Sequence, residues 1–357
     1  MSILIKNFHE TEFIKLPGDQ YYTLEMILSS IDAILLFLGL GLETLVIASI
    51  LRVHQKSVDT LFVLSLCCAD FIFNLYQIPA LLIVLAAGGW QFGGAGCKIS
   101  TAMIVTTLAI SITSITFITL NRYLAILHKQ NITRNQAVVM ITSAWIVLTA
   151  ISILYISNKE LAEKSIALQP SRLYCFYDFG SDDAVVITGL ITILCFMAVP
   201  LLFLIIAYSQ IIVFYRSMNR RWDEYVFSQV YKSEKKLLIK AIAITMTFFA
   251  TYSVELIVRL YQFVTKKDVH LIIDLVGTMG ICSNTLLNSI ILLNYDAHVQ
   301  KSALEMLGLE EWWKSRKSEK STIKSNVEKA AEKKTSIQNT QPAIDTIELT
   351  PKLLIIH

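Results

Sequence analysis

We single out five ionisable side chains inside long apolar stretches of this chain, where a charge is costly. They are Glu43, Asp70, Glu255, Arg259 and Asp274. In hydrocarbon such groups face the interior of a helical bundle and mark sites for ligands, ions or protons. Each of the five is therefore a candidate functional residue.

Two arrangements of these residues suggest particular chemistry. Glu255 and Arg259 are four residues apart, so on a helix they share a face and can pair. Either the pair satisfies itself near the outer membrane surface, or one member meets a polar ligand in the outer half of the bundle. Asp70 lies in mid-stretch, where a carboxylate takes up a proton or finds a cation and hydrogen-bond donors. Uncharged polar side chains occur at similar depths: Asn74, Ser111, Asn284 and Asn288.

The elements that must position these residues are apolar blocks. Of 357 residues, 54% are hydrophobic and 17% charged, against about 25% charged in an average soluble domain. With a mean hydropathy of +0.57, this excludes a disordered chain and argues against one water-soluble globule. Each block can cross about 30 Å of hydrocarbon as a helix, which satisfies its own backbone in lipid. We predict an all-α membrane protein, a seven-transmembrane helix bundle with spans at 26–51, 60–87, 98–127, 137–157, 184–215, 236–264 and 269–294.

The basic residues near the span ends predict the orientation. With the N-terminus outside, the cytoplasmic short loops and span ends carry twelve Lys and Arg residues and the outer loops six, as expected for cytoplasmic loops. We therefore expect a plasma-membrane protein with a cytoplasmic C-terminus. We expect an extracellular arm over 1–25, the seven-helix bundle over 26–295, an amphipathic interfacial helix over 296–313 and a disordered tail over 314–357.

Two cysteines flank the apolar blocks and lie on the outer side in this orientation. They are Cys97 and Cys175, and an oxidising exterior allows a disulfide between them. Sequence alone does not select this pairing, although no other cysteine lies outside. Such a bond would tie an outer loop over the mouth of the bundle.

Several motifs, in order and at matching separations, resemble the rhodopsin-like (class A) G-protein-coupled receptors over most of 26–310. Trp90-Gln-Phe92-Gly93-x-x-x-Cys97 is similar to the family's first outer loop, and Leu66-x-x-Ala69-Asp70 to its second-helix signature. The remaining matches are Asn121-Arg122-Tyr123, Trp145, Pro200 with Tyr208, and Asn288-Ser289-Ile290-Ile291-Leu292.

The resemblance implies roles for particular residues. Arg122 would hold the inactive state and meet the G protein in the active one, with Glu234 as its inactive-state partner. Tyr252 stands where the family's sixth-helix tryptophan toggles. The implied coupling and switch set is Asn121, Arg122, Tyr123, Glu234, Tyr208, Tyr252 and Asn288. The implied sodium pocket, with oxygen ligands suited to a hard cation, is Asp70, Ser111, Asn284 and Asn288; a plain hydrogen-bonded helix contact is the alternative.

The departures from the family pattern bear on activation. Glu43 replaces the usual first-helix Asn beside Asp70, so two carboxyls that should not both be ionised share one region. Asn121 replaces the acid before Arg122, which should loosen the arginine and raise basal activity. Leu292 removes the tyrosine hydroxyl used in the active state.

The same resemblance narrows the ligand without naming it. Some loops are similar to those of opsins, but Cys282 occupies the place of the Schiff-base lysine, so covalent retinal is not expected. Ile104 stands where amine receptors carry an acid, which disfavours an amine. A small molecule, a lipid and a peptide remain open. The expected pocket residues are Thr101, Ile104, Leu108, Glu255, Arg259, Asp274, Thr278 and Cys282.

The function expected from these observations is G-protein activation by an extracellular ligand, with membrane lipid around the bundle. The serine- and threonine-rich tail also suggests a kinase and arrestin as partners. Two alternatives remain: a receptor-like protein that does not signal, and a proton or cation transporter using intramembrane carboxylates. No phosphate loop or metal-spaced His–Glu pair indicates an enzyme, and no basic cluster indicates nucleic acid.

Overall fold

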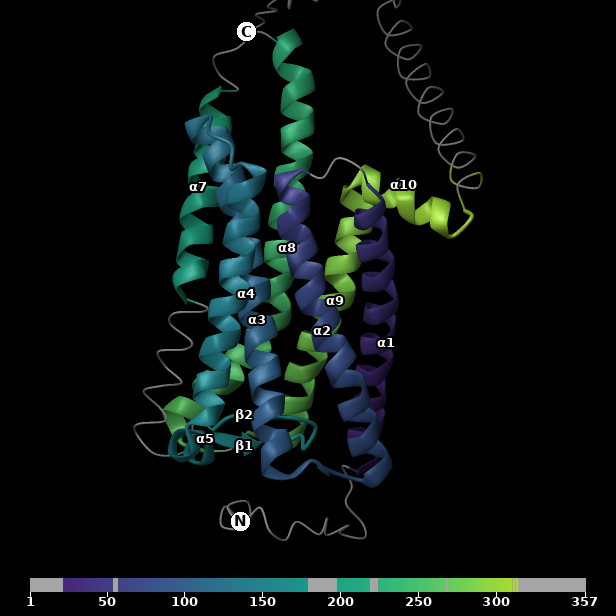
Figure 1. Cartoon of the computed structure of the whole chain (residues 1–357), viewed down its shortest axis with the longest axis vertical. Coiled ribbons are helices and arrows are strands. Elements are labelled where there is room, and N and C mark those ends of the chain that lie inside the picture. The colour runs from purple at the N-terminus through teal and green to yellow at the C-terminus, as the bar shows by residue number, and fades with distance from the viewer. Residues whose placement is uncertain are drawn as a thin grey trace, which may run out of the picture. The chain divides into compact units, whose positions relative to one another are not determined.

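A computed structural model describes residues 22–53, 57–178, 198–218, 224–267, 269–309, 311 and 313. Seven long helices form the bundle (Figure 1). They are α1 (Tyr22–Arg52), α2 (Val58–Ala87), α3 (Gly93–Tyr123), α4 (Arg134–Ser157), α7 (Val199–Met218), α8 (Glu224–Thr265) and α9 (Leu271–Tyr295).

Six helices of the described residues are long and apolar enough to cross a membrane. A seventh apolar helix is shorter, over Val199–Phe214, and the first part of the expected fifth span, 184–197, lies outside the described residues. The expected spans thus correspond to helices of the bundle. Several helices begin earlier than expected, α1 at Tyr22, α3 at Gly93 and α8 at Glu224, because polar first turns can face water without a hydropathy signal.

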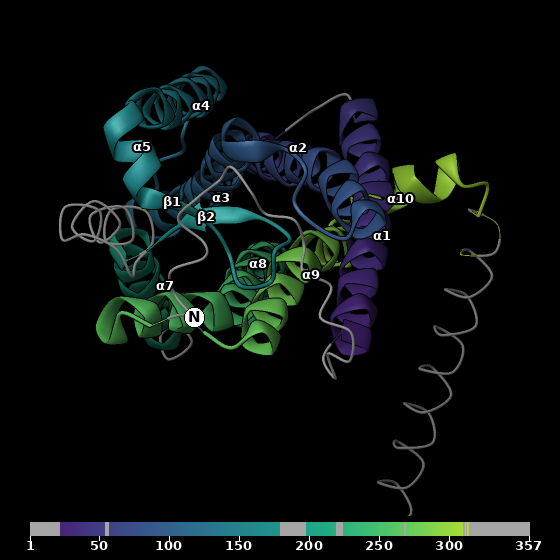
Figure 2. The ribbon, with the colours of Figure 1, turned by 90° about the horizontal axis from the view of Figure 1, so that it is seen from below.

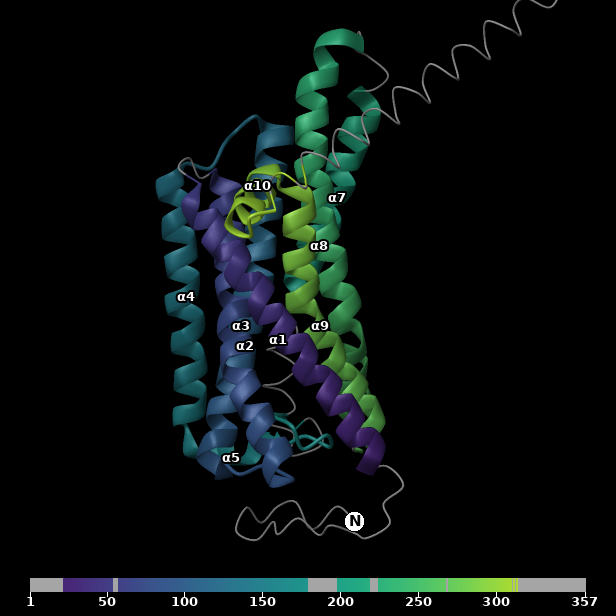
Figure 3. The ribbon, with the colours of Figure 1, turned by 90° about the vertical axis from the view of Figure 1, so that its right-hand side faces the viewer.

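Each long helix of the bundle packs against at least one other long helix. α1 lies against α2 and α9, α8 lies against α9, and α3 contacts α2, α4, α7 and α8. α1 runs obliquely across the other helices (Figure 3). We call the end of the bundle at which α1 begins the outer end and the opposite end the inner end, after the orientation expected from the sequence. Apolar side chains fill one cluster toward the outer end, which includes Leu81 and Ile104, and one toward the inner end, which includes Phe62 and Phe248.

Local sequence signals explain where some helices begin and how closely they approach. The Ser57 side chain accepts the amide N–H of Thr60 at the start of α2, and Thr133 with Gln136 forms a capping box at the start of α4. Gly280 lets α9 meet α8 closely: a Cβ there would lie 2.3 Å from the Thr251 carbonyl oxygen.

A short hairpin covers the outer end of the bundle. After α5 (Lys159–Ser165), β1 (Ile166–Leu168) pairs antiparallel with β2 (Cys175–Tyr177), with Ile166 opposite Tyr177. Figure 2 shows this hairpin beside α3 at that end, and both strands contact α3. The apolar pattern of the sequence gave no indication of it.

The inner end carries two further short elements. A π-helix, η1 (Leu124–His128), continues from α3, and α10 (Ala297–Met306) follows α9. α10 is shorter than the interfacial helix expected over 296–313. One compact unit ends at Ala303. Of the arm expected over 1–25, residues 22–25 belong to α1 and residues 1–21 lie outside the described residues, as does the tail expected over 314–357.

Candidate functional site

Arg259 of α8 is the centre of a buried polar cluster at the outer end. It pairs with Glu255 one turn earlier and with Asp274 of α9, whose Oδ1 lies 3.2 Å from Nη2. Gln169 and Gln262 accept further hydrogen bonds from the guanidinium. A buried cation with two carboxylates and two amide oxygens around it has its charge compensated.

Two residues of the loop between β1 and β2, Ser171 and Tyr174, make hydrogen bonds to this cluster. The Tyr174 hydroxyl accepts from Arg259 and lies 3.1 Å from Glu255 Oε1 and 3.3 Å from Asp274 Oδ1. Burial, only partly offset by Arg259, holds the pKa of Tyr174 well above its usual value, so the hydroxyl keeps its proton. The backbone N–H of Ser171 donates to Asp274 Oδ2 at 2.9 Å. The loop is therefore fastened to α8 and α9.

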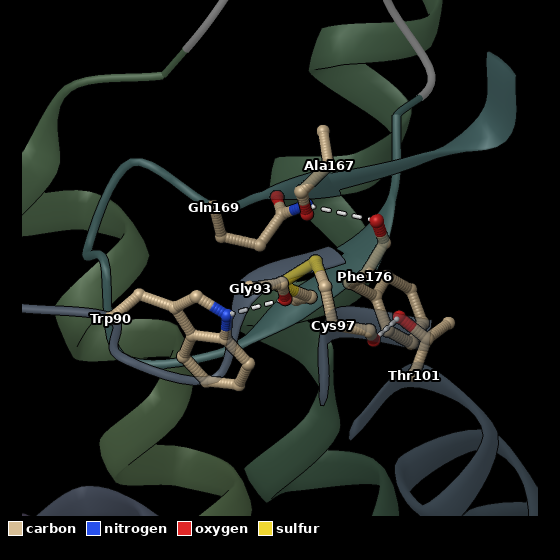
Figure 4. The surroundings of a disulfide bond; sticks show 8 residues. Trp90, Gly93, Cys97, Thr101, Ala167, Gln169 and Phe176 are labelled. Carbon is tan, nitrogen blue, oxygen red and sulfur yellow. Dashed lines mark hydrogen bonds between the residues drawn. A yellow bond between two sulfur atoms is a disulfide. The ribbon is translucent and has the colours of Figure 1, made fainter. Parts of the chain in front are cut away.

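The disulfide between Cys97 and Cys175 fastens the same hairpin to α3. Figure 4 shows it beside Trp90, whose indole N–H donates to the Gly93 carbonyl at 3.1 Å, and below Gln169, which donates to the carbonyls of Ala167 and Phe176. The disulfide expected in the sequence is thus present. The disulfide attaches the hairpin to α3, while the Tyr174 hydroxyl contacts attach it to α8 and α9. The hairpin and its loop form a roof over this end of the bundle.

Beneath this hairpin lies a small cavity of about 20 Å³, which has room for about one water molecule. Its walls come from α1, α2, α3 and α9, and Leu173 and Tyr174 of the loop close it. The lining residues are Asp32, Phe73, Gln77, Leu81, Ile104, Leu173, Tyr174, Thr278, Ile281 and Cys282.

The cavity includes part of the expected pocket. Ile104, Thr278 and Cys282 line it, whereas Glu255, Arg259 and Asp274 lie in the Tyr174 cluster and engage each other. Of the two interpretations of the Glu255–Arg259 spacing, the structure places the pair with internal partners. Thr101 donates to the Cys97 carbonyl, and Leu108 packs against the inner apolar cluster.

Asp32 and Gln77 were not among the expected site residues. Both are buried, at 1% and 7% exposure. The Thr278 hydroxyl lies 3.3 Å from Asp32 Oδ2, while Asp32 Oδ1 and Gln77 Oε1 have no hydrogen-bond partner. The signal that could have found Asp32 is an acid within the first apolar block; it lies near the outer end among serines, which made it look like an ordinary helix start.

Asp70 is held midway through the bundle by two donors. The Ser111 hydroxyl and the Asn288 amide each donate to its carboxylate at 2.9 Å. Asn284 instead accepts a hydrogen bond from Thr251 at 3.2 Å. Asn288 Oδ1 is buried without a hydrogen-bond partner. The contacts of Asp70 are those of a hydrogen-bonded contact between helices, and a sodium ion at this place stays a prediction.

Glu43 has its own partner beside that group. Its Oε2 accepts the Asn74 amide at 2.9 Å, and the Asn74 carbonyl in turn accepts the Thr285 hydroxyl at 3.4 Å. Glu43 Oε1 is buried and unpaired. The carboxylates of Glu43 and Asp70 thus have different hydrogen-bond donors, Asn74 for the first and Ser111 with Asn288 for the second.

At the inner end, Arg122 forms a buried ion pair with Asp59 in the first turn of α2. Asn121 donates to the other oxygen of the same carboxylate at 2.6 Å. The expected partner, Glu234, belongs to α8, but its side chain lies outside the described residues. The expectation of a loosened arginine is corrected here: the acid missing before Arg122 is replaced by one from α2, which was overlooked because Asp59 directly precedes an apolar block.

Tyrosine hydroxyls connect α3, α7 and α8 near the same end, and an ion pair connects α8 to the end of α9. The Tyr208 hydroxyl lies 2.8 Å from Thr119 Oγ1 and 3.1 Å from Thr245 Oγ1, and Tyr123 donates to Gln210 at 2.7 Å. Tyr252 stacks on Phe248 within α8. Lys240 pairs with Asp296 at 3.0 Å and so ties α8 to the end of α9. Burial alone would raise the pKa of Asp296, but Lys240 and two backbone N–H groups bring it below its usual value.

Comparison with known proteins agrees with this architecture. The 7 transmembrane receptor (rhodopsin family) profile matches residues 43–292. Melatonin receptor type 1B of Mus musculus is 39% identical over 85 residues, 24% of this chain and 23% of its own length. Chemerin-like receptor 1 of Bos taurus is 25% identical over 160 residues, 45% of this chain and 44% of its own length.

This chain therefore spans less than half the length of the curated relatives it matches. The crystal structure of squid rhodopsin has the same fold, with a TM-score of 0.71 and 19% identity over 80% of this chain and 86% of the other. Because the family profile covers most of the bundle, the chain is a multi-pass membrane protein that belongs to the rhodopsin family of seven-transmembrane receptors, which are signalling receptors and not enzymes.

Proposed function

We propose that the chain is a cell-surface receptor that converts binding of an extracellular ligand into activation of a heterotrimeric G protein. The observation that carries this proposal is the buried contact of Asp59 with both Arg122 and Asn121 at the inner end of α2 and α3. An arginine enclosed in this way is a two-state element: it is paired in the resting form and released when the helices separate.

The orientation follows from the same proposal. The disulfide-tied hairpin and the cavity belong to the outer end, and Arg122 with the basic third loop belongs to the cytoplasmic end. A ligand that prefers the separated form shifts the population toward it. The Lys240–Asp296 pair, which joins α8 to the end of α9, is then one of the contacts that this movement breaks.

We also propose that Asp70, Ser111 and Asn288 hold a sodium ion in the resting form. The Asp70 carboxylate and the Ser111 hydroxyl oxygen would be its ligands, and the unpaired Asn288 oxygen supports the proposal because it would be a further ligand. A cation bound there would neutralise a carboxylate in the centre of the bundle. The tail serines and threonines would be sites for a kinase and then arrestin, as the family membership suggests.

The experiment that tests the function is ligand-free nucleotide exchange in cells across a panel of Gα subunits. Wild type is compared with Arg122→Ala, at matched surface expression. A basal signal that disappears in Arg122→Ala supports coupling and names the Gα class. Silence in wild type, in Asp59→Asn and with every added ligand would favour a receptor-like protein that does not signal.

A further inference from the structure

We propose that the buried cluster around Arg259 binds one proton from the extracellular side, and that this proton helps to hold the loop between β1 and β2 on the bundle. The ligand of this site is the hydrogen ion, and the added function is a response to acidity outside the cell. The inference rests on the proposed receptor function and orientation, in which this end of the bundle faces the exterior.

The cluster contains one more negative charge than positive charge. Glu255 and Asp274 both form ion pairs with Arg259, and among the described residues no other lysine or arginine pairs with either carboxylate. All three side chains are buried, at 8%, 0% and 3% exposure respectively. An unbalanced charge away from water is costly, so a buried carboxylate without a cation of its own takes up a proton.

The hydrogen bonds of the cluster indicate which oxygen takes the proton. Both oxygens of Asp274 have donors: Arg259 and Tyr174 at Oδ1, and the backbone N–H of Ser171 at Oδ2. At Glu255 the donors all meet Oε1, and Oε2 is buried without a partner. A neutral carboxyl group costs less to bury than an ionised one. The geometry therefore favours Glu255 Oε2 as the place of the proton.

The packing around this oxygen leaves no room for a metal ion. A Cβ built on Gly277 would lie 2.6 Å from Glu255 Oε2, so this oxygen lies directly against the backbone of α9. Glu255 does not line the small cavity beneath the hairpin. A metal ion would need several oxygen ligands arranged around it, whereas a proton needs no space of its own.

The other ionisable groups around the cluster do not supply the missing charge. In the loop, Tyr174 stays neutral because burial holds its pKa above its usual value, and Arg172 is exposed to solvent. On α8, Tyr252 is a phenol one turn earlier, and on α1 Asp32 is a further acid, whose carboxylate meets α9. His270, at the exposed start of α9, is a residue type that titrates near neutral pH. The test must therefore exclude this imidazole.

Proton binding and attachment of the loop are linked. Ser171 and Tyr174 cover the carboxyls when the loop is closed, and water reaches Glu255 when the loop opens. Because water stabilises the ionised carboxylate, the closed form binds the proton more tightly than the open form. Attachment of the loop is therefore stronger at low pH and weaker at high pH. One proton changes the ratio of closed to open forms by at most about tenfold per pH unit.

The test is hydrogen–deuterium exchange of the purified full-length receptor in detergent, without a G protein, between about pH 5 and 8. The reporter is the amide N–H of Ser171, which donates to Asp274 at 2.9 Å. After correction for the intrinsic exchange rate at each pH, its protection should fall by about threefold or more from the acid to the alkaline end. Protection that does not change with pH would overturn the proposal.

The wild-type protein also provides an internal control, which does not depend on the folding of any variant. The amide N–H of Asp178 donates to the Ser165 carbonyl at 2.8 Å, in the part of the hairpin that the Cys97–Cys175 disulfide attaches to α3. Its protection should be constant over the same range. An equal change at both amides would mean that pH acts on the whole hairpin and would count against the site.

Variants locate the proton. Glu255→Gln puts a neutral group of the same shape into the cluster, so protection of the loop should no longer depend on pH. Glu160→Gln changes an exposed acid of α5, and His270→Asn removes the imidazole but keeps a residue suited to cap α9. Both controls should keep the wild-type dependence on pH. A dependence that persists in Glu255→Gln, or that disappears in His270→Asn, would overturn the assignment.

The two proposals fail separately, because the exchange measurement needs no G protein. If pH acts on the loop through Glu255 and no Gα responds, the coupling proposal is wrong and the proton site stands. If the basal signal depends on Arg122 and the loop does not respond to pH, the receptor proposal stands and the proton site is wrong.

Discussion

At the scale of single residues, the acid that holds Arg122 comes from a neighbouring helix. Asp59 of α2 contacts both Arg122 and Asn121, so a carboxylate on α2 takes the place of one on α3. Removing one member of a buried ion pair leaves the other charge uncompensated, which costs about 3–5 kcal/mol.

Asp59→Asn should therefore raise ligand-free nucleotide exchange by about fivefold or more, within the range of typical coupling energies. The double variant Asp59→Asn with Asn121→Asp returns a carboxylate to the same contact and should restore a low basal signal. Basal exchange at matched surface expression measures both. A wild-type signal in Asp59→Asn would mean that this pair does not hold the resting form.

Asp70 leads to a prediction about salt. Replacing sodium by potassium at equal ionic strength should lower the unfolding temperature of the resting receptor, because an ion bound only to the folded state stabilises it. A loss of 1 kcal/mol corresponds to about 2–4 °C for a domain of this size. Asp70→Asn should abolish the difference between the two salts, and a difference that persists would exclude Asp70 as a ligand.

The sequence predicted some of these residues and missed others for a physical reason. Asp70, Glu255 and Arg259 stand out because they interrupt apolar runs, and the structure buries all three. Asp59 and Asp32 lie close to the ends of apolar blocks, where an acid is ordinary. Only the packing of α2 on α3, and of α1 on α9, buries them.

At the scale of elements, the contact between α8 and α9 depends on a glycine. A Cβ at Gly280 would lie 2.3 Å from the Thr251 carbonyl oxygen, and backbone cannot move aside as a flexible side chain can. Gly280→Ala should push the two helices apart and lower the unfolding temperature.

Gly41 provides the matched control for this variant. It is also in the interior of a helix, but a Cβ there has no neighbour within 4 Å. Gly41→Ala should leave stability unchanged or raise it by up to about 1 kcal/mol, from the better helix propensity of alanine. If both variants have the same unfolding temperature in detergent, close approach at Gly280 is not what limits the packing.

The elements themselves were predictable to the extent that hydropathy determines them. Apolar blocks located the helices of the bundle, because every helix that crosses lipid must be apolar over about 20 residues. The hairpin of β1 and β2 was not predicted, since its three-residue strands are too short for an alternating pattern. The extension of α8 to Glu224 was missed because that part of the helix is polar.

At the scale of the whole molecule, the cavity was beyond sequence analysis because it combines four helices and a loop. Residues far apart in the chain, such as Asp32 and Thr278, become neighbours only in the bundle. The family, by contrast, followed from motifs that are each local. Sequence therefore identified the receptor family, and the structure was needed to bring together residues that are distant in the chain.

The roof over the cavity is fixed on two sides, by the disulfide to α3 and by Tyr174 to α8 and α9. Tyr174→Phe keeps the ring and removes the hydroxyl contacts, so the loop should open more often. We expect any ligand bound beneath the loop to associate and dissociate about three to ten times faster, with little change in affinity, because opening of a lid affects both directions. Tyr261→Phe, at an exposed position of α8, should leave both rates unchanged.

Such a roof separates how tightly a ligand is held from how long it stays. A ligand held beneath Tyr174 would leave only when the loop opens, so the loop, and not the ligand's own contacts, would set the lifetime of the occupied receptor. The duration of the response would then depend on how often the loop opens. A brief pulse of ligand outside the cell would produce a response of fixed duration, even after the ligand in solution has disappeared.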